Sequence, residues 1–145
     1  PPPIVPLAAL ETDDAFIRDL PRSAVSKLMR EALGLIREAR FQEALNALQA
    51  AYEQNFQDTG TAEILFWKAV CFDGLGDNRQ ALAAYGKLIM EFPRHPRTAL
   101  GLLRQAAVFM RLGDAATARL TLQKLIAEFP ISPEAEVARE RLREI

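Results

Sequence analysis

The sequence has one cysteine and one histidine among 145 residues. A lone thiol excludes an internal disulfide, and one Cys with one His is too few for a structural zinc site. Nucleophilic catalysis needs a base within reach of the nucleophile, yet Cys71 falls within an expected helix and His95 lies between Pro93 and Pro96. There is also no glycine-rich phosphate loop. We therefore expect no enzyme activity, no metal and no cofactor.

Charge of one sign and long apolar runs are also missing. The chain has 18 basic and 19 acidic side chains, so its formal net charge is −1, and the two signs are mixed along the sequence. Such a balance does not favour nucleic acid or an anionic membrane as partner. No run of 18 apolar residues is present, so we expect no direct membrane insertion. With half of its residues hydrophobic, the chain suits one domain with a continuous core.

The first 20 residues differ from the rest. Pro1, Pro2, Pro3 and Pro6 favour an extended arm and are unsuited to a signal-peptide core. Thr12 followed by two aspartates predicts a short helix to about Leu20, because acids in the first turn complement the helix dipole. We divide the chain into this arm with its short helix, residues 1–20, and a single domain, residues 21–145.

A repeat organises that domain. Gly76-Asp77 recurs as Gly113-Asp114, 37 positions later, and Glu91-Phe92-Pro93 recurs at the same spacing as Glu128-Phe129-Pro130. A fixed period of this size is typical of helical repeat proteins. Extending the period backwards gives a weaker first copy. The predicted repeats are about 22–58, 59–95 and 96–132, followed by a capping helix at 133–145.

Helix start and stop signals divide each repeat into two helices. Thr61, Asp77, Asp114 and Ser132 are expected N-caps, and Gly76 ends the helix before it. The expected helices are residues 22–39, 42–56, 61–75, 77–92, 97–112, 115–129 and 133–145. The last has an apolar stripe of Ala135, Ala138, Leu142 and Ile145 among charged residues, which is typical of the cap of a solenoid.

The repeats resemble the tetratricopeptide pattern. The pattern asks for a large residue, a small residue four later and an aromatic three after that, then for an alanine, a large residue and a proline in the second helix. The second copy supplies Leu65, Ala69, Phe72, Ala81, Tyr85 and Pro93, the third supplies Leu102, Ala106, Phe109, Ala118, Leu122 and Pro130, and the first supplies Leu28, Ala32, Leu35, Ala44 and Leu48. The resemblance implies an all-α fold, a tetratricopeptide-like right-handed superhelix of three helical hairpins plus a C-terminal capping helix.

The 37-residue period exceeds the usual 34, because Phe-Pro-x-x-Pro connections lengthen it. In this feature the chain is similar to the tetratricopeptide domains of periplasmic Tol-Pal cell-division coordinators and of outer-membrane assembly lipoproteins. The resemblance implies a scaffold of the bacterial cell envelope, periplasmic or envelope-associated. A cytoplasmic location stays open, because a single cysteine fits either compartment.

One stripe of residues is a candidate binding surface. On the first helix of each hairpin it begins one residue after the large residue of the pattern, which is Leu28, Leu65 or Leu102. The first helices line the concave side of a tetratricopeptide superhelix. The alternative is that the stripe packs one first helix against the next. The predicted groove residues are Met29, Phe66, Leu103, Met110, Arg37, Asp73, Arg104 and Arg111.

Two functions follow from this surface. The first is a non-catalytic scaffold that binds a protein or peptide in the groove, with an apolar or extended ligand favoured by the apolar stripe. The residues 1–6 arm is itself a candidate occupant, given its composition. The alternative is a self-assembly module, in which the stripe makes a homo-oligomer and no separate ligand binds.

Overall fold

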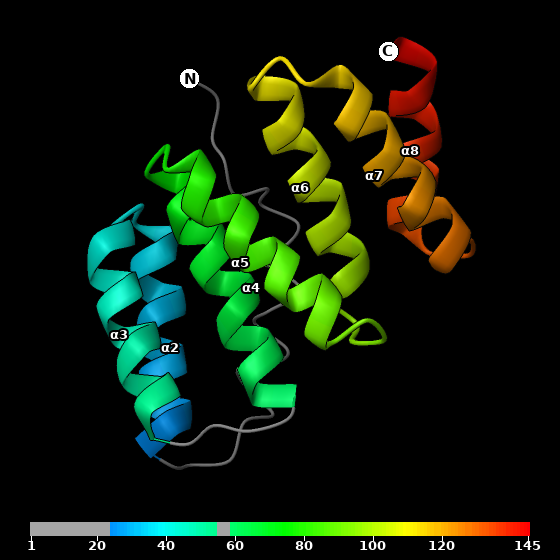
Figure 1. Cartoon of the computed structure of the whole chain (residues 1–145). Coiled ribbons are helices and arrows are strands. Elements are labelled where there is room, and N and C mark those ends of the chain that lie inside the picture. The colour runs from blue at the N-terminus through cyan, green and yellow to red at the C-terminus, as the bar shows by residue number, and fades with distance from the viewer. Residues whose placement is uncertain (1–23, 55–58) are drawn as a thin grey trace.

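The computed structural model describes residues 24–54 and 59–145, and these residues form seven helices without a strand. The first hairpin pairs α2 (Ala24–Arg37) with α3 (Phe41–Glu53), the second pairs α4 (Thr59–Gly74) with α5 (Asn78–Glu91), and the third pairs α6 (Thr98–Arg111) with α7 (Ala115–Glu128). The cap, α8 (Pro133–Glu144), packs on α7 and α6. The all-α expectation of three hairpins and a capping helix is confirmed (Figure 1).

Most predicted helix ends lie within two residues of the observed ones, but one cap was wrong. Asp77, Asp114 and Ser132 accept hydrogen bonds from the backbone N–H groups of Gln80, Thr117 and Ala135, as N-caps do. Thr61 is not a cap, because α4 already begins at Thr59. Gly60 is buried, so the earlier start places this small residue inside the packed hairpin. The predicted helix at residues 12–20 and the boundary at residue 20 lie outside the described residues.

The three hairpin turns share one backbone design. At the second turn Gly76 has a φ of 76°, its N–H donates to Asp73 O, and the Asp77 N–H donates to Phe72 O. This is a Schellman motif, which satisfies carbonyls at the end of a helix and needs a left-handed residue. Gly113 repeats it at the third turn with a φ of 79°. At the first turn Ala39 takes the same position with a φ of 59°.

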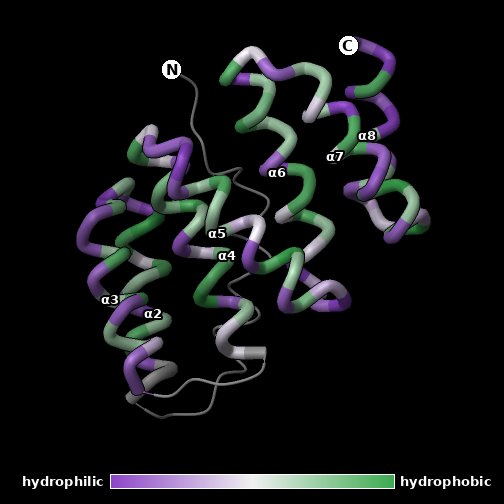
Figure 2. Tube along the Cα trace, viewed as in Figure 1, coloured by the Kyte–Doolittle hydropathy of each residue, from purple (hydrophilic) through white to green (hydrophobic). Residues whose placement is uncertain are grey.

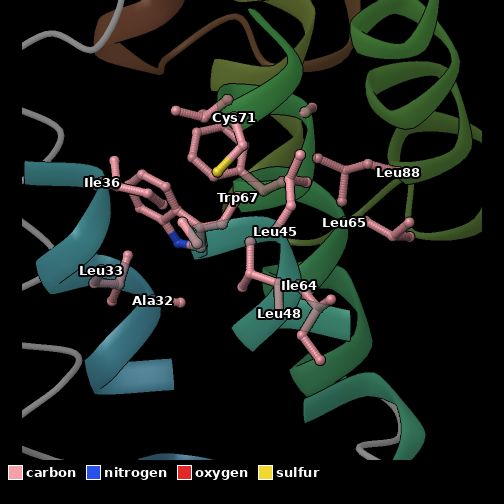
Figure 3. Packing of buried hydrophobic residues seen from close by; sticks show 14 of the residues in the cluster. Ala32, Leu33, Ile36, Leu45, Leu48, Ile64, Leu65, Trp67, Cys71 and Leu88 are labelled. Carbon is pink, nitrogen blue, oxygen red and sulfur yellow. The ribbon is translucent and has the colours of Figure 1, made fainter. Parts of the chain in front are cut away.

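Two apolar clusters fill the stack. The larger joins the first two hairpins, extends to Val108 of α6 and includes Trp67, which Figure 3 shows reaching from α4 towards Ile36 of α2. The smaller joins α6, α7 and α8, and contains Ala135 and Ala138 of the cap. Figure 2 shows α8 as mostly hydrophilic outside these contacts, as predicted for a cap. Leu142 and Ile145 are partly buried against the same cluster, which confirms the predicted apolar stripe.

Small residues allow the hairpins to approach closely. Ala69 and Ala81, the small residues of the tetratricopeptide pattern in the second hairpin, are fully buried where α4 meets α5. At the start of α6, a Cβ added to Gly101 would lie 3.0 Å from Leu88 Cδ2, so this glycine brings α6 close to α5. The connection between these helices is held by Thr98, whose hydroxyl donates to Phe92 O at 2.5 Å. The second and third hairpins are therefore fixed in one register.

Candidate functional site: the inner helices

The candidate site is built on α2, α4 and α6, the first helices of the three hairpins. Figure 1 shows α3 in front of α2 and α5 in front of α4, with α6 beside α7. The structure buries most of the predicted apolar stripe: Met29 and Phe66 are fully buried and Leu103 is 8% exposed, whereas Met110 is 41% exposed. Packing between helices, the alternative left open by the sequence, therefore accounts for the position of Met29 and Phe66.

An ion network joins α4 to α6. Asp73, at the end of α4, is 2% exposed. Arg104 of α6 donates from Nε to Tyr85 Oη at 2.8 Å and places Nη2 3.4 Å from Asp73 Oδ2. The Tyr85 hydroxyl donates to the same carboxylate oxygen at 3.2 Å. Burial raises the pKa of the Tyr85 phenol, so this hydroxyl stays protonated and remains a donor.

Arg111 completes the network from its exposed side. Its Nη2 lies 2.5 Å from Asp73 Oδ1 and 2.8 Å from Asn78 Oδ1, while its side chain is 41% exposed. Asp73 thus holds two arginines from the third hairpin. A buried carboxylate with this many donors is satisfied, and removing it would take away the negative charge that pairs with the buried Arg104.

A second polar contact lies at the opposite ends of the same helices. Arg97, just before α6, places Nε 3.2 Å from Glu63 Oε1, and its guanidinium lies over the rings of Phe66 and Trp67, 5.2 and 5.5 Å from their centroids. The Trp67 indole N–H donates to Glu63 Oε2 at 3.3 Å. Burial raises the pKa of Glu63, to about 7, whereas the Trp67 N–H and the adjacent Arg97 favour its ionised form.

The charged residues predicted for the groove therefore fall into two groups. Asp73 and Arg104 are buried and tie α4 to α6, so assigning them to an open groove was wrong. Arg37 is exposed and Arg111 is partly exposed, and both remain predicted contact residues. Sequence reasoning missed the roles of Glu63, Trp67 and Arg97. The sequence did contain a signal for these roles. When the second and third repeats are aligned at 37 residues, Trp67 aligns with Arg104 and Gly74 with Arg111, so the two copies differ in the residues at the contact between α4 and α6.

The thiol is a core group. Cys71 lies in a helix, as predicted, and is fully buried there, and burial raises its pKa to about 12. A thiol held in this form is a poor nucleophile. Within residues 24–54 and 59–145 no group of three or more His, Cys, Asp or Glu side chains is placed to hold a metal ion. The helices in the same ranges include none that is long and apolar enough to cross a membrane.

Comparisons with known proteins identify the repeats. Family models described as tetratricopeptide repeat match residues 63–95 and 101–130, and a further model with the same description matches residues 29–77. Together these matches cover most of the three hairpins: the first two each correspond to one helix pair, α4 with α5 and α6 with α7, and the third spans α2, α3 and α4. The chain is a tetratricopeptide repeat protein.

Solved structures support the tetratricopeptide fold. The complex of PcrH with the chaperone binding region of PopB matches with a TM-score of 0.68 at 20% identity, covering 87% of this chain and 97% of that one. A tetratricopeptide repeat protein from Parabacteroides merdae matches with a TM-score of 0.65 at 22% identity, covering 95% of this chain and 54% of that one. At these identities the likeness concerns the fold alone. A comparison with the curated proteins finds no match.

Proposed function

We propose that this tetratricopeptide repeat protein is a non-catalytic scaffold that binds a peptide or protein segment on the inner face formed by α2, α4 and α6. The observation that carries the proposal is the fold: stacked hairpins place the three first helices side by side, and stacks of helical repeats use this arrangement to bind extended peptides. A relative of the same fold, PcrH, was solved with a peptide region of PopB.

The chemistry of the accessible inner positions defines the ligand. Met110 is 41% exposed and Ala107 is half-buried, which provides an apolar strip on α6. Arg111 follows Met110 on α6, Arg37 occupies the equivalent repeat position on α2, and both reach solvent. A peptide that combines apolar side chains with carboxylates matches this surface, because the arginines favour acids and the strip favours burial of apolar groups.

The setting that we propose is the bacterial cell envelope. Its support is the resemblance of the long repeat, with its Phe-Pro-x-x-Pro connection, to periplasmic Tol-Pal coordinators and outer-membrane assembly lipoproteins. Fractionation of cells that express the untagged natural gene tests the setting. Recovery in the periplasmic or membrane fraction supports it, whereas recovery with cytoplasmic markers contradicts it.

Site-specific photocrosslinking tests the binding surface. A photoreactive amino acid replaces Met110 on the inner face, and the matched control replaces Met90, which is 83% exposed on α5. We expect one protein to be captured through position 110 and not through position 90. Equal capture at both positions, or capture only at position 90, would place the binding surface on the second helices instead.

Light scattering across a range of protein concentrations tests the alternative, a self-assembly module. The described residues include exposed apolar side chains outside the groove, Leu120 at 65% and Ile131 at 95%. A monomer at all concentrations excludes self-assembly. A mass that rises to a defined oligomer, together with no capture at position 110, replaces the scaffold proposal.

A further inference from the structure

Charge is distributed unevenly between the two layers of helices. The first helices α2, α4 and α6 together carry six basic and three acidic side chains, a net charge of +3. The second helices α3, α5 and α7 carry four basic and four acidic side chains, a net charge of zero. Two of the three acids on the first helices, Glu63 and Asp73, are buried and already paired with arginines. The inner layer is therefore basic towards solvent and the outer layer is neutral.

The basic groups of the inner layer are regularly placed. Arg30 and Arg37 on α2 are seven residues apart, as are Arg104 and Arg111 on α6, and the two pairs occupy equivalent positions of the first and third repeats. Seven residues are about two turns, so the members of each pair lie on one face, about 10 Å apart along the helix. Met110 and Ala107 lie between them on α6. Arg104 is buried against Asp73, so the arginines of these pairs that are exposed to solvent are Arg37 and Arg111. The inner face thus combines these two arginines with an apolar strip.

The first 20 residues have the opposite character. They contain four carboxylates, Glu11, Asp13, Asp14 and Asp19, and one base, Arg18, for a net charge of −3. Residues 21–145 contain 17 basic and 15 acidic side chains, for a net charge of +2. Phe16, Ile17 and Leu20 follow the acids at spacings of one and three residues, which places apolar groups on one side of the predicted short helix. This is the ligand chemistry inferred for the groove.

The segment is also tethered where it can reach that face. It joins the chain just before α2, which starts at Ala24 and carries Arg30 and Arg37. Stacked helices lie about 10 Å apart, so α6 is about 20 Å from α2. With residues 12–20 helical, about 14 Å long, and residues 21–23 extended over about 10 Å, the segment spans about 24 Å, which is enough to reach from α2 to α6. A short tether also gives a high effective concentration, so weak contacts suffice to hold the segment.

We infer that residues 11–20 of this chain dock on the inner face of α2, α4 and α6 as an intramolecular occupant, with their carboxylates towards the arginines and Phe16, Ile17 and Leu20 towards the strip at Met110. The inference rests on the proposed function in one respect: the segment then competes with any peptide partner for the same surface. An external acidic peptide must displace the segment. The apparent affinity of the protein for that peptide is therefore its intrinsic affinity multiplied by the fraction of molecules in which the segment is not docked.

Paramagnetic relaxation in the full chain tests the docking without any partner. The Ala9→Cys variant in a Cys71→Val background carries one nitroxide beside the acidic segment. We expect amide resonances of the inner helices, such as those of Arg30 and Ala107, to be broadened. Resonances of the outer helices, such as those of Ala83 and Ala116, keep their intensity. Equal broadening of both layers, or of the outer layer alone, overturns the inference.

Charge reversal supplies the matched comparison. The Asp13→Lys, Asp14→Lys pair in the spin-labelled chain is expected to restore the intensity of the inner resonances. The Glu136→Lys, Glu140→Lys pair, which makes the same change of charge on exposed positions of α8, is expected to leave the broadening unchanged. If both pairs act alike, general electrostatic attraction replaces a specific docking site, and the inference fails.

A mixing experiment excludes exchange between copies. Isotope-labelled chain without nitroxide is mixed with unlabelled chain that carries it, and we expect no broadening. Broadening in the mixture means that the segment docks on a second copy, which overturns the intramolecular form. If the inner resonances are broadened but photocrosslinking captures no protein, the result counts against the proposed partner and not against the docked segment. If a protein is captured but no resonance is broadened, the result counts against the docked segment alone.

Discussion

The second and third hairpins are copies of one plan, yet they differ where they meet. At equivalent positions the second copy has Trp67, Asp73 and Tyr85, and the third has Arg104, Met110 and Leu122. The second copy therefore supplies a buried acid and a phenol, and the third supplies the arginine that both of them bind. The third copy meets the cap differently, through an apolar cluster that includes Leu122 and Ala138.

This difference teaches how one repeat selects its neighbour. An apolar interface tolerates many partners of similar shape, whereas a buried charge is stable only against its counter-ion. A third hairpin stacked on another third hairpin would place Arg104 against Met110 and Leu122. We infer that the Asp73–Tyr85–Arg104 cluster specifies the order of the repeats, while Ala81 and Ala118 provide close packing that is common to both.

The largest effect is expected from breaking the cluster. Asp73→Asn keeps the volume but removes the negative charge that pairs with the buried Arg104, so we expect it to lower the free energy of unfolding by about 3–5 kcal/mol in urea denaturation. Replacing the cluster as a whole, with Asp73→Met, Tyr85→Leu and Arg104→Met, is expected to recover most of that loss. A loss below about 1 kcal/mol for Asp73→Asn would show that water solvates Arg104, and the ordering role would be withdrawn.

A smaller effect is expected where the copies agree. Ala81 and Ala118 are both fully buried at the same position of their hairpins. Substituting leucine at either position overpacks the contact between paired helices, with an expected loss of about 1–3 kcal/mol in each. The control is Ala83→Leu, at an exposed position of α5. Unequal losses at Ala81 and Ala118, or a thermal melt unchanged from the parent, would contradict common packing in the two hairpins.

The turns of the three hairpins differ in the residue at the left-handed position. Ala39 adopts the left-handed conformation that Gly76 and Gly113 adopt in the other copies, and a Cβ is unfavourable there. Ala39→Gly is expected to stabilise the protein by about 1 kcal/mol, and Gly76→Ala to destabilise it by about 1–2 kcal/mol. Both are read from the midpoint of thermal unfolding. If Ala39→Gly lowers the midpoint, the entropy of the unfolded chain outweighs the relief at this turn.

The smallest effect is expected at Cys71, which aligns with Val108 of the third copy. Both side chains are fully buried and similar in size, so Cys71→Val should change the free energy of unfolding by less than about 1 kcal/mol. In the parent protein the thiol has its pKa raised to about 12 by burial, so at pH 8 it is protonated. We expect a thiol reagent to react with it only after unfolding, and rapid reaction of the native protein would contradict this.

The fold was largely predictable because its signals are local. Asp114 and Ser132 were identifiable as caps, since a short polar side chain before an apolar period satisfies free N–H groups of the next helix. Thr61 shows the same signal, a short polar side chain before an apolar period, but it is not a cap. The helix α4 begins at Thr59, and Gly60 is buried within it. The turn at Ala39 also differed from expectation, since alanine gives no sign of a left-handed residue.

The candidate site was less predictable because its contacts are long-range. The repeat register correctly places Asp73 and Arg104 on first helices, but it does not show that they face each other across the contact between α4 and α6. Nor does it distinguish a stripe that faces a ligand from one that packs against a neighbour, which is why Phe66 was assigned to the groove. Burial decides between these, and burial depends on how tightly successive hairpins stack.

Trp67 gives the molecule an internal spectroscopic reporter. It is the single tryptophan of the sequence, it is fully buried, its N–H bonds Glu63, and Arg97 of the third hairpin lies over its ring. Its emission therefore responds when the third hairpin separates from the second, while circular dichroism responds only when helices melt. A red shift of the emission that precedes the loss of helix signal would show the repeats uncoupling before they unfold, and coincident transitions would show that they unfold as one unit.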